Sequence, residues 1–307
     1  MRHHAHPFVV VRASHPHNGS GGLNRWGGAW RNSRPPLVSV SVTMDTDVAP
    51  TQVAPSPRRI RAEILIVLGL SLGKSAIYAA VKLAERYAAA TPVKDQATTI
   101  NPSRSGIDVF DLIYQVLAIA FALVPVALAV FLLSSHGQSA KRILGLTGPA
   151  RAWWRDVGFG AVLAACIGIP GLALYYVGRA IGQNVYINTS GLPSAWWAST
   201  TLLLSAAAAA VLEETVIVGY LVTRLEQLRW SVPAIILASA LLRGGYHLYQ
   251  GWPMALGNVA MGAVFAWFFI KRRRLAPLIV AHFLLDFVSF VGPEVIPSEW
   301  LAALGLV

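Results

Sequence analysis

The chain has 307 residues, of which 55% are hydrophobic and only 13% are charged, and its mean hydropathy is +0.55. Soluble domains carry about a quarter charged residues, so this composition excludes an ordinary soluble enzyme and indicates a protein whose main solvent is lipid. The formal net charge is +11, but the positive residues lie in short clusters between apolar runs. This distribution is typical of membrane topology, and we expect no nucleic-acid partner.

Residues 1–57 differ in composition from the rest of the chain. They hold five of the eight histidines, many Gly, Pro and Ser, and no acidic residue before Asp45. We predict that this basic segment is a disordered tail. An alternative is that translation begins at Met44, because 44–57 forms a short polar leader before the basic residues at 58–61. The intact mass of the native protein tests that alternative.

Seven apolar runs follow, and each is long enough, or nearly so, to cross a bilayer as a helix. We therefore predict an all-α fold, a polytopic membrane helix bundle of about seven transmembrane helices (six to eight) with no soluble domain. The fifth and seventh runs are short. The runs lie near Ile60–Lys82, Phe110–Leu133, Val157–Gly178, Trp196–Tyr220, Val232–Tyr249, Trp252–Ile270 and Leu275–Val291.

These runs divide the chain into three parts after the tail. Residues 58–156 hold two transmembrane helices and a basic cytoplasmic loop, 157–292 form the membrane core, and 293–307 form an interfacial segment. Thirteen Lys and Arg fall in the terminal segment and loops of one side, and the opposite loops hold only Lys94 and Arg104, with Arg86 and Arg179 at their borders. By the positive-inside rule, we predict a multi-pass protein of the cell membrane with a cytoplasmic N-terminus. The thirteen residues are Arg58, Arg59, Arg61, Lys141, Arg142, Arg151, Arg155, Arg224, Arg229, Lys271, Arg272, Arg273 and Arg274.

Six ionisable residues lie inside the later apolar runs, where a charge costs about 2.5–3.5 kcal/mol at a helix centre. They form pairs on three runs. Two of the pairs have a spacing of four, which places both members on one helix face, whereas the two glutamates are adjacent and point about 100° apart. Such residues normally face a protein interior or water, so they mark a candidate functional site. The six are Glu213, Glu214, Arg243, His247, His282 and Asp286.

Carboxylates and imidazoles in an apolar pocket can activate water. A buried glutamate can act as a general base, and histidines can donate hydrogen bonds or carry protons. The same residue types can bind zinc, in which case the ligands would be Glu213, His247 and His282. The chain has no His-Glu-x-x-His pattern, so such a site would have to be assembled across helices. The choice between no cofactor and zinc stays open.

The order of these residues resembles the CPBP family, which comprises the type II CAAX prenyl endopeptidases and the bacteriocin-processing Abi membrane proteins. The family motifs run Glu-Glu-x-x-x-Arg, Phe-x-x-x-His and His-x-x-x-Asn/Asp on successive membrane helices, and the resemblance covers roughly residues 195–290. The matching segments are Glu213-Glu214-Thr215-Val216-Ile217-Val218-Gly219-Tyr220, Arg243-Gly244-Gly245-Tyr246-His247 and His282-Phe283-Leu284-Leu285-Asp286.

The resemblance implies an intramembrane endopeptidase that acts on a membrane-associated protein or peptide, and members are often described as metalloproteases. It implies that Glu213, helped by His247, activates the attacking water. His282 and Asp286 would then bind the oxyanion or stabilise the tetrahedral intermediate, and Glu214 would be structural or would position a helix.

Two positions depart from the family pattern. Val218 stands where the first motif has Arg, and Arg243 stands where the second has Phe. We predict that Arg243 replaces the missing guanidinium and pairs with Glu214 or Asp286, because an unpaired arginine inside a membrane helix is costly. His247 lies near the far end of its run, away from the depth of the other two motifs. We therefore expect that a tilt of this helix, or a break at Gly244-Gly245, brings His247 close to them.

Two other classes of function are compatible with these residues. A non-catalytic membrane scaffold or immunity-type protein could retain the motifs as a structural polar network, and the displaced arginine supports that alternative. A proton- or ion-coupled transporter could use the same groups as a relay. The lack of paired repeat halves argues against the transporter.

Overall fold

The fold is that of a computed structural model, which describes residues 55–134, 138–188, 191–192, 195–295 and 299. The predicted disordered tail and the alternative start at Met44 lie outside these residues, apart from 55–57. Most of the predicted interfacial segment 293–307 also lies outside them.

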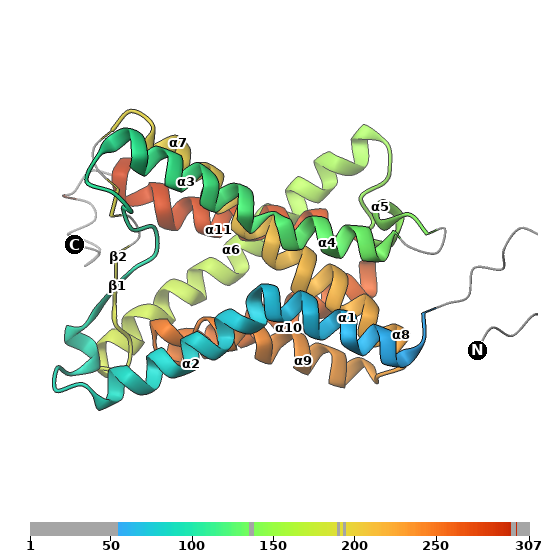
Figure 1. Cartoon of the computed structure of the whole chain (residues 1–307), viewed down its shortest axis with the longest axis horizontal. Helices are drawn as coiled ribbons and strands as arrows, with labels where there is room; N and C mark the ends of the chain where they lie inside the picture. Colours follow the sequence, from blue (N-terminus) through green and yellow to red (C-terminus); the bar gives the residue numbers. More distant parts are fainter. Residues whose placement is uncertain (1–54, 135–137, 189–190, 193–194, 296–298, 300–307) are drawn as a thin grey trace, which may run out of the picture. The chain divides into compact units, whose positions relative to one another are not determined.

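The structure is 78% helical with almost no strands, which confirms the predicted all-α membrane bundle (Figure 1). A parallel pairing of β1 (Ala97–Thr99) with β2 (Tyr186–Asn188) was not predicted from the sequence. The short helices are η1 (Val93–Asp95), η2 (Glu214–Tyr220) and η3 (Leu248–Gln250). The α-helices are α1 (Pro57–Leu70), α2 (Leu72–Ala88), α3 (Asp108–Ala122), α4 (Val124–Leu133), α5 (Ala140–Ile143), α6 (Ala150–Ala180), α7 (Ala198–Glu213), α8 (Leu221–Gln227), α9 (Val232–Tyr246), α10 (Trp252–Arg272) and α11 (Ala276–Val295).

All seven predicted runs are helical, but they are not seven equal spans. Within the described residues, four helical segments are long and apolar enough to cross a membrane: Asp108–Leu133, Ala150–Ala180, Ala198–Gln227 and Trp252–Arg272. The first predicted run is not straight, because α1 and α2 meet at Ser71 with a bend of 54°, and together they make a possible fifth span. The fifth run forms the 15-residue α9, and both α9 and the apolar part of α11 are shorter than a full span, as predicted.

The most extensive helix contacts join helices from the second half of the chain. Helix α9 packs along α10, and α11 packs against both α6 and α7. The N-terminal α2 lies beside α9. Large apolar side chains also cover the outer surface, for example Trp196 at 89% and Phe131 at 71% exposed. An apolar outer face of this kind fits a lipid environment.

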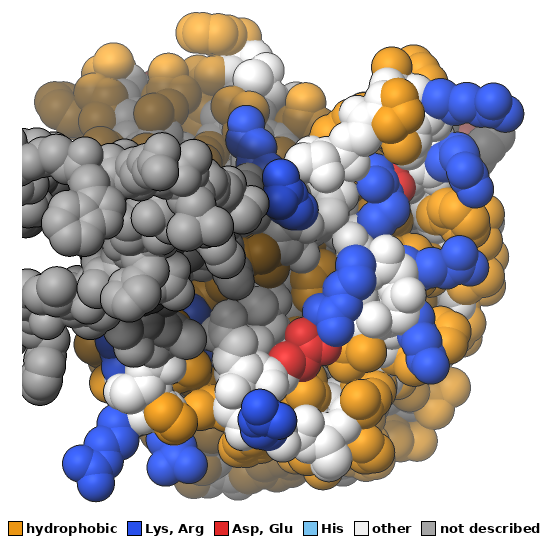
Figure 2. Space-filling model, turned by 90° about the vertical axis from the view of Figure 1, so that its right-hand side faces the viewer, with side chains coloured by type: hydrophobic (Ala, Val, Ile, Leu, Met, Phe, Trp, Pro, Cys, Tyr) orange, Lys and Arg blue, Asp and Glu red, His pale blue; other side chains and the backbone are white. Residues whose placement is uncertain are grey.

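Ion pairs join several of the basic segments at one end of the bundle. Arg224 Nη2 lies 2.6 Å from Glu63 Oε2, and Arg273 Nη1 lies 2.7 Å from Glu226 Oε2. Figure 2 views the end where α5 and α8 lie in Figure 1 and shows Lys and Arg side chains among hydrophobic ones. The prediction that Arg224 lies in a basic loop is wrong. Arg224 lies within α8 and is 2% exposed. Its buried partner Glu63, on α1, explains why a helix can hold it there.

Gly244 permits the close approach of α9 and α10. A Cβ at this position would lie 2.4 Å from Val259 Cγ2 and 2.8 Å from the backbone oxygen of Ala255. We expect Gly244→Ala to destabilise the fold by about 1–3 kcal/mol, because the backbone of α10 cannot move away without separating the two helices. Thermal unfolding in detergent measures the effect.

Gly158, on α6, provides the control for this substitution. A Cβ there would have no atom within 4 Å, so Gly158→Ala gains helix propensity without a clash and is expected to be neutral or slightly stabilising. Equal destabilisation by both substitutions would contradict the close-approach explanation.

Candidate active site

The two adjacent glutamates lie in the middle of a long membrane helix. Helix α7 ends at Glu213 and continues as the π-helix η2 and then as α8, so the whole rod runs from Ala198 to Gln227. π-helical turns are rare and occur frequently at functional sites. The Glu214 side chain is 0% exposed and the Glu213 side chain is 14% exposed. The glutamates are therefore not a solvated helix end, and they have different surroundings.

The predicted ion pair of Arg243 is present, and its partner is Glu214. Arg243 is fully buried, its Nη2 lies 2.5 Å from Glu214 Oε1, and its Nη1 lies 3.5 Å from Glu213 Oε2. The guanidinium also lies over the ring of Phe265, 5.3 Å from the centroid. Val218, which occupies the motif's arginine position, is buried in the apolar core. The guanidinium is thus supplied by α9 instead of the helix that carries the glutamates.

His282 connects all three carboxylates of the site. Its Nδ1 lies 2.7 Å from Glu214 Oε1, and its Nε2 lies 3.8 Å from Glu213 Oε2 and 3.5 Å from Asp286 Oδ2. Asp286 reaches the ring because it is four residues further along α11. The same Oε1 atom of Glu214 accepts a hydrogen bond from the Arg243 guanidinium, so it acts as an acceptor toward His282 and Nδ1–H donates. Nε2 is directed toward the other two carboxylates.

His247 comes directly after the last residue of α9. Its Nδ1 lies 3.0 Å from the backbone oxygen of Arg243. A carbonyl can only accept, so Nδ1–H donates and Nε2 is the proton-accepting nitrogen of the neutral ring. The ring centroid lies 4.7 Å from that of Tyr246, whose hydroxyl bonds to Glu213. Helix α9 is continuous through Gly244-Gly245, so the break considered for this position is absent. His247 lies near Glu213 because α9 ends beside the π-helix.

Sequence reasoning missed one member of the site, Tyr246. This side chain is 5% exposed, and its hydroxyl donates to Glu213 Oε2 at 2.7 Å. The available signal was its position next to His247. The candidates, however, were chosen as charged or titratable residues inside apolar runs, and a neutral tyrosine does not meet that criterion. Tyr246 fixes one carboxylate oxygen of Glu213. The other, Oε1, has no hydrogen-bond partner among the described residues.

Removal of this hydroxyl tests whether the orientation of Glu213 matters. A hydrogen bond to a charged group contributes about 1.5–3 kcal/mol. If Glu213 has the catalytic role in peptide cleavage that the family resemblance implies, Tyr246→Phe is expected to lower the cleavage rate about 10- to 100-fold while the protein stays folded. Cleavage and thermal unfolding are measured together. Tyr78→Phe is the control, because Tyr78 is 71% exposed on α2. Unchanged cleavage by Tyr246→Phe would show that the hydroxyl has no role in the chemistry.

The three residues predicted as ligands if zinc is bound do not form a metal site in this arrangement. Within the described residues, no group of three His, Cys, Asp or Glu side chains is placed to hold a metal ion. Glu213, His247 and His282 are held instead by hydrogen bonds to Tyr246, to the Arg243 backbone and to Glu214. No chemical step is therefore assigned to a metal here.

The fold and the site define a helical membrane protein with a buried cluster of carboxylates and histidines. Residues 195–288 match the family described as Type II CAAX prenyl endopeptidase Rce1-like. This match confirms the resemblance to the CPBP family that the three motifs predicted, and it spans all six predicted site residues. Comparisons with curated proteins and with solved structures found no match for the chain.

Proposed function

We propose that this protein is an intramembrane endopeptidase of the CAAX-protease type, which hydrolyses a peptide bond of a membrane-associated protein or peptide. One observation carries the proposal: the two adjacent glutamates are not equivalent. Glu214 is fully buried and bound by Arg243 and His282. Glu213 is partly exposed and keeps one carboxylate oxygen without a partner in the described part of the chain. Glu214 is therefore suited to holding the helices together, and Glu213 is suited to accepting a proton.

Glu213 is the general base in this proposal. Its free Oε1 accepts a proton from water, and the oxygen of that water attacks the carbonyl carbon of the substrate. His247 supports this step, because the Nε2 of its neutral ring can accept a hydrogen bond from the attacking water. General-base catalysis by a positioned side chain contributes about 10²–10⁴-fold to a rate.

His282 stabilises the oxyanion that forms on the carbonyl oxygen. With Nδ1–H donated to Glu214, a protonated ring donates its second proton from Nε2 to the substrate. Asp286 acts through His282, whose Nε2 lies 3.5 Å from it, because an ionised carboxylate in direct contact would repel the oxyanion. The proton taken by Glu213 then moves to the leaving amine nitrogen as the C–N bond breaks. The products are a carboxylate and an amine.

The proposal places the protein in the cell membrane with a cytoplasmic N-terminus. The joining of basic segments at one end of the bundle supports this orientation. From Glu213 to Arg224 the helix rises about 16 Å, which would place the site within the cytoplasmic half of the membrane. A prenylated substrate is not implied by the described site residues, which supply carboxylates, imidazoles, a guanidinium and a phenol hydroxyl.

A comparison of protein termini in native cells tests the function. Cells express wild type, Glu213→Gln or Glu85→Gln at equal membrane levels; Glu85, the control, lies outside the site with a side chain that is 64% exposed. We expect a set of new termini that is present with wild type and Glu85→Gln and absent with Glu213→Gln. These termini would also identify the substrates. Identical termini in all three, with folded proteins, would contradict a protease and favour the scaffold alternative, and proton flux into proteoliposomes would then test the transporter.

A further inference from the structure

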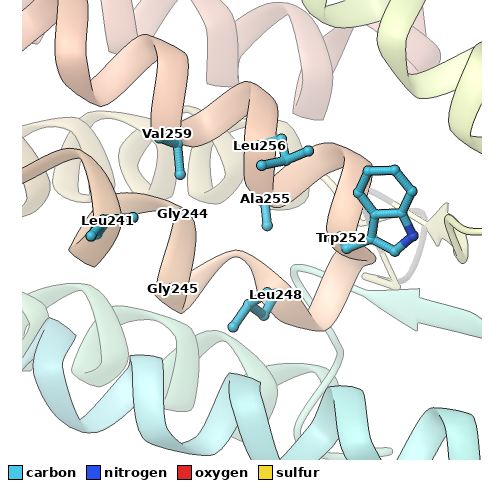
Figure 3. A pocket seen from close by; sticks show the side chains of 8 residues that line it. All are labelled: Leu241, Gly244, Gly245, Leu248, Trp252, Ala255, Leu256 and Val259. Carbon is cyan, nitrogen blue, oxygen red and sulfur yellow. The ribbon is translucent and has the colours of Figure 1, made fainter. Parts of the chain in front are cut away.

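One cavity lies between α9 and α10 and is lined by Gly244, Gly245 and apolar side chains such as Leu256 and Val259 (Figure 3). A second cavity lies away from the candidate active site, where the start of α6, the end of α10 and the start of α11 meet. Its volume is about 230 Å³. It combines cationic and aromatic side chains, and no step of the proposed hydrolysis uses it. The lining includes Arg155, Asp156, Phe159, Phe268, Arg272 and Arg274.

The cavity has an excess of positive charge. Arg274 and Asp156 form a two-point ion pair, in which Nε lies 2.7 Å from Oδ1 and Nη2 contacts Oδ2. This pair neutralises the one carboxylate of the lining. Arg155 and Arg272 are both exposed and form no ion pair with any described residue. Two guanidinium groups at this cavity are therefore available to an anion, and guanidinium groups suit phosphate geometry.

The same cavity has an apolar wall. Phe159 and Phe268 make an edge-to-face contact with ring centroids 6.5 Å apart, and Phe159 remains 43% exposed. Arg272 lies over the Phe159 ring, 5.9 Å from its centroid. Nearby Trp154 is 77% exposed, as expected for a residue at the membrane–water boundary. A free anion would use only the guanidinium groups, whereas a phosphate attached to acyl chains would use the aromatic wall as well.

We propose that this cavity binds the phosphate headgroup of an anionic phospholipid. Arg155 and Arg272 contact the phosphate, and the Phe159–Phe268 wall contacts the first carbons of the acyl chains. Basic pockets between membrane helices at the charged membrane face are suited to such headgroups. Arg274 precedes α11, and His282 lies eight residues further, about 12 Å along the helix axis. A bound lipid would thus hold the α6–α11 junction close to the candidate active site, although its binding does not depend on protease activity.

Lipid retention by the purified full-length protein tests the proposal. The protein is equilibrated with vesicles of equal parts phosphatidylglycerol and phosphatidylcholine, and the lipids that stay bound are counted by native mass spectrometry. We expect wild type to prefer phosphatidylglycerol about 10-fold or more and Arg155→Gln/Arg272→Gln to lose most of that preference. The control Arg58→Gln/Arg61→Gln removes two exposed positive charges from α1 and is expected to keep it.

Two further arms separate the possible sources of the phosphate. Inorganic phosphate is added to the wild-type complex, and we expect no displacement of the lipid, because the free ion lacks the apolar contact. Displacement at millimolar phosphate would overturn the lipid assignment. An equal loss by the control pair would show only general surface charge and would also overturn it. If the double variant does not fold, Arg272→Gln alone gives the same comparison, since its exposed side chain is not part of the core.

Discussion

Replacement of Arg243 by Met is expected to destabilise the protein by about 3–5 kcal/mol. Arg243 and Glu214 are both 0% exposed and lie 2.5 Å apart. The substitution removes the positive partner and leaves a buried carboxylate with only His282 beside it, and such an uncompensated charge is costly. SDS titration in mixed micelles measures the free energy of unfolding.

A second substitution distinguishes this electrostatic cause from a loss of packing. Glu214→Gln alone is expected to destabilise the wild type, because it removes the close ionic partner of Arg243 and leaves only the 3.5 Å contact with Glu213. In the Arg243→Met background the same change is expected to stabilise, because it removes the orphaned negative charge. The sign of the Glu214→Gln effect therefore reverses between the two backgrounds. Additive effects of the two substitutions would contradict the ion pair as the source of stability.

Glu213→Gln is expected to lower kcat/KM by about 10²–10⁴-fold on a purified substrate identified from the cellular termini. The amide keeps the size of the side chain and can still bond to Tyr246, but it cannot take a proton from water. Because the charge of Glu213 also lies 3.5 Å from Arg243, a small change in stability accompanies the loss. Cleavage kinetics and thermal unfolding are measured on the same preparation.

The matching substitution at the neighbouring position separates the roles of the two glutamates. Glu214→Gln is expected to act mainly on stability, with a smaller loss of cleavage through the altered position of His282. If Glu214→Gln abolishes cleavage while Glu213→Gln retains it in a folded protein, the assignment of the general base is wrong.

Much of the site could be predicted from the sequence because charges inside apolar runs are expensive. That cost limits the choice of candidates to a few residues, and the spacing of four places His282 with Asp286 on one face of α11. The same cost predicted a partner for Arg243. The cost does not indicate whether that partner is Glu214 or Asp286, because the rotation of the helices and the π-helical turn after Glu213 determine which carboxylate faces Arg243. Tyr246 was missed, because a neutral hydroxyl in an apolar run costs much less free energy than a charge and therefore does not identify itself as a site residue.

By itself, the sequence determined the membrane class, the helical segments, the clustering of basic residues and the chemical types in the site. These properties depend on local composition, on the length of apolar runs and on the free energy of burying charge. The tertiary structure alone decided that α1 and α2 bend at Ser71, that α9 ends beside the π-helix, and that Arg243 rather than a residue of α7 or α8 neutralises Glu214. It also decided which glutamate stays accessible. These are matters of how helices distant in the chain rotate and pack against one another, and side chains of helices far apart in sequence meet only after that packing is complete.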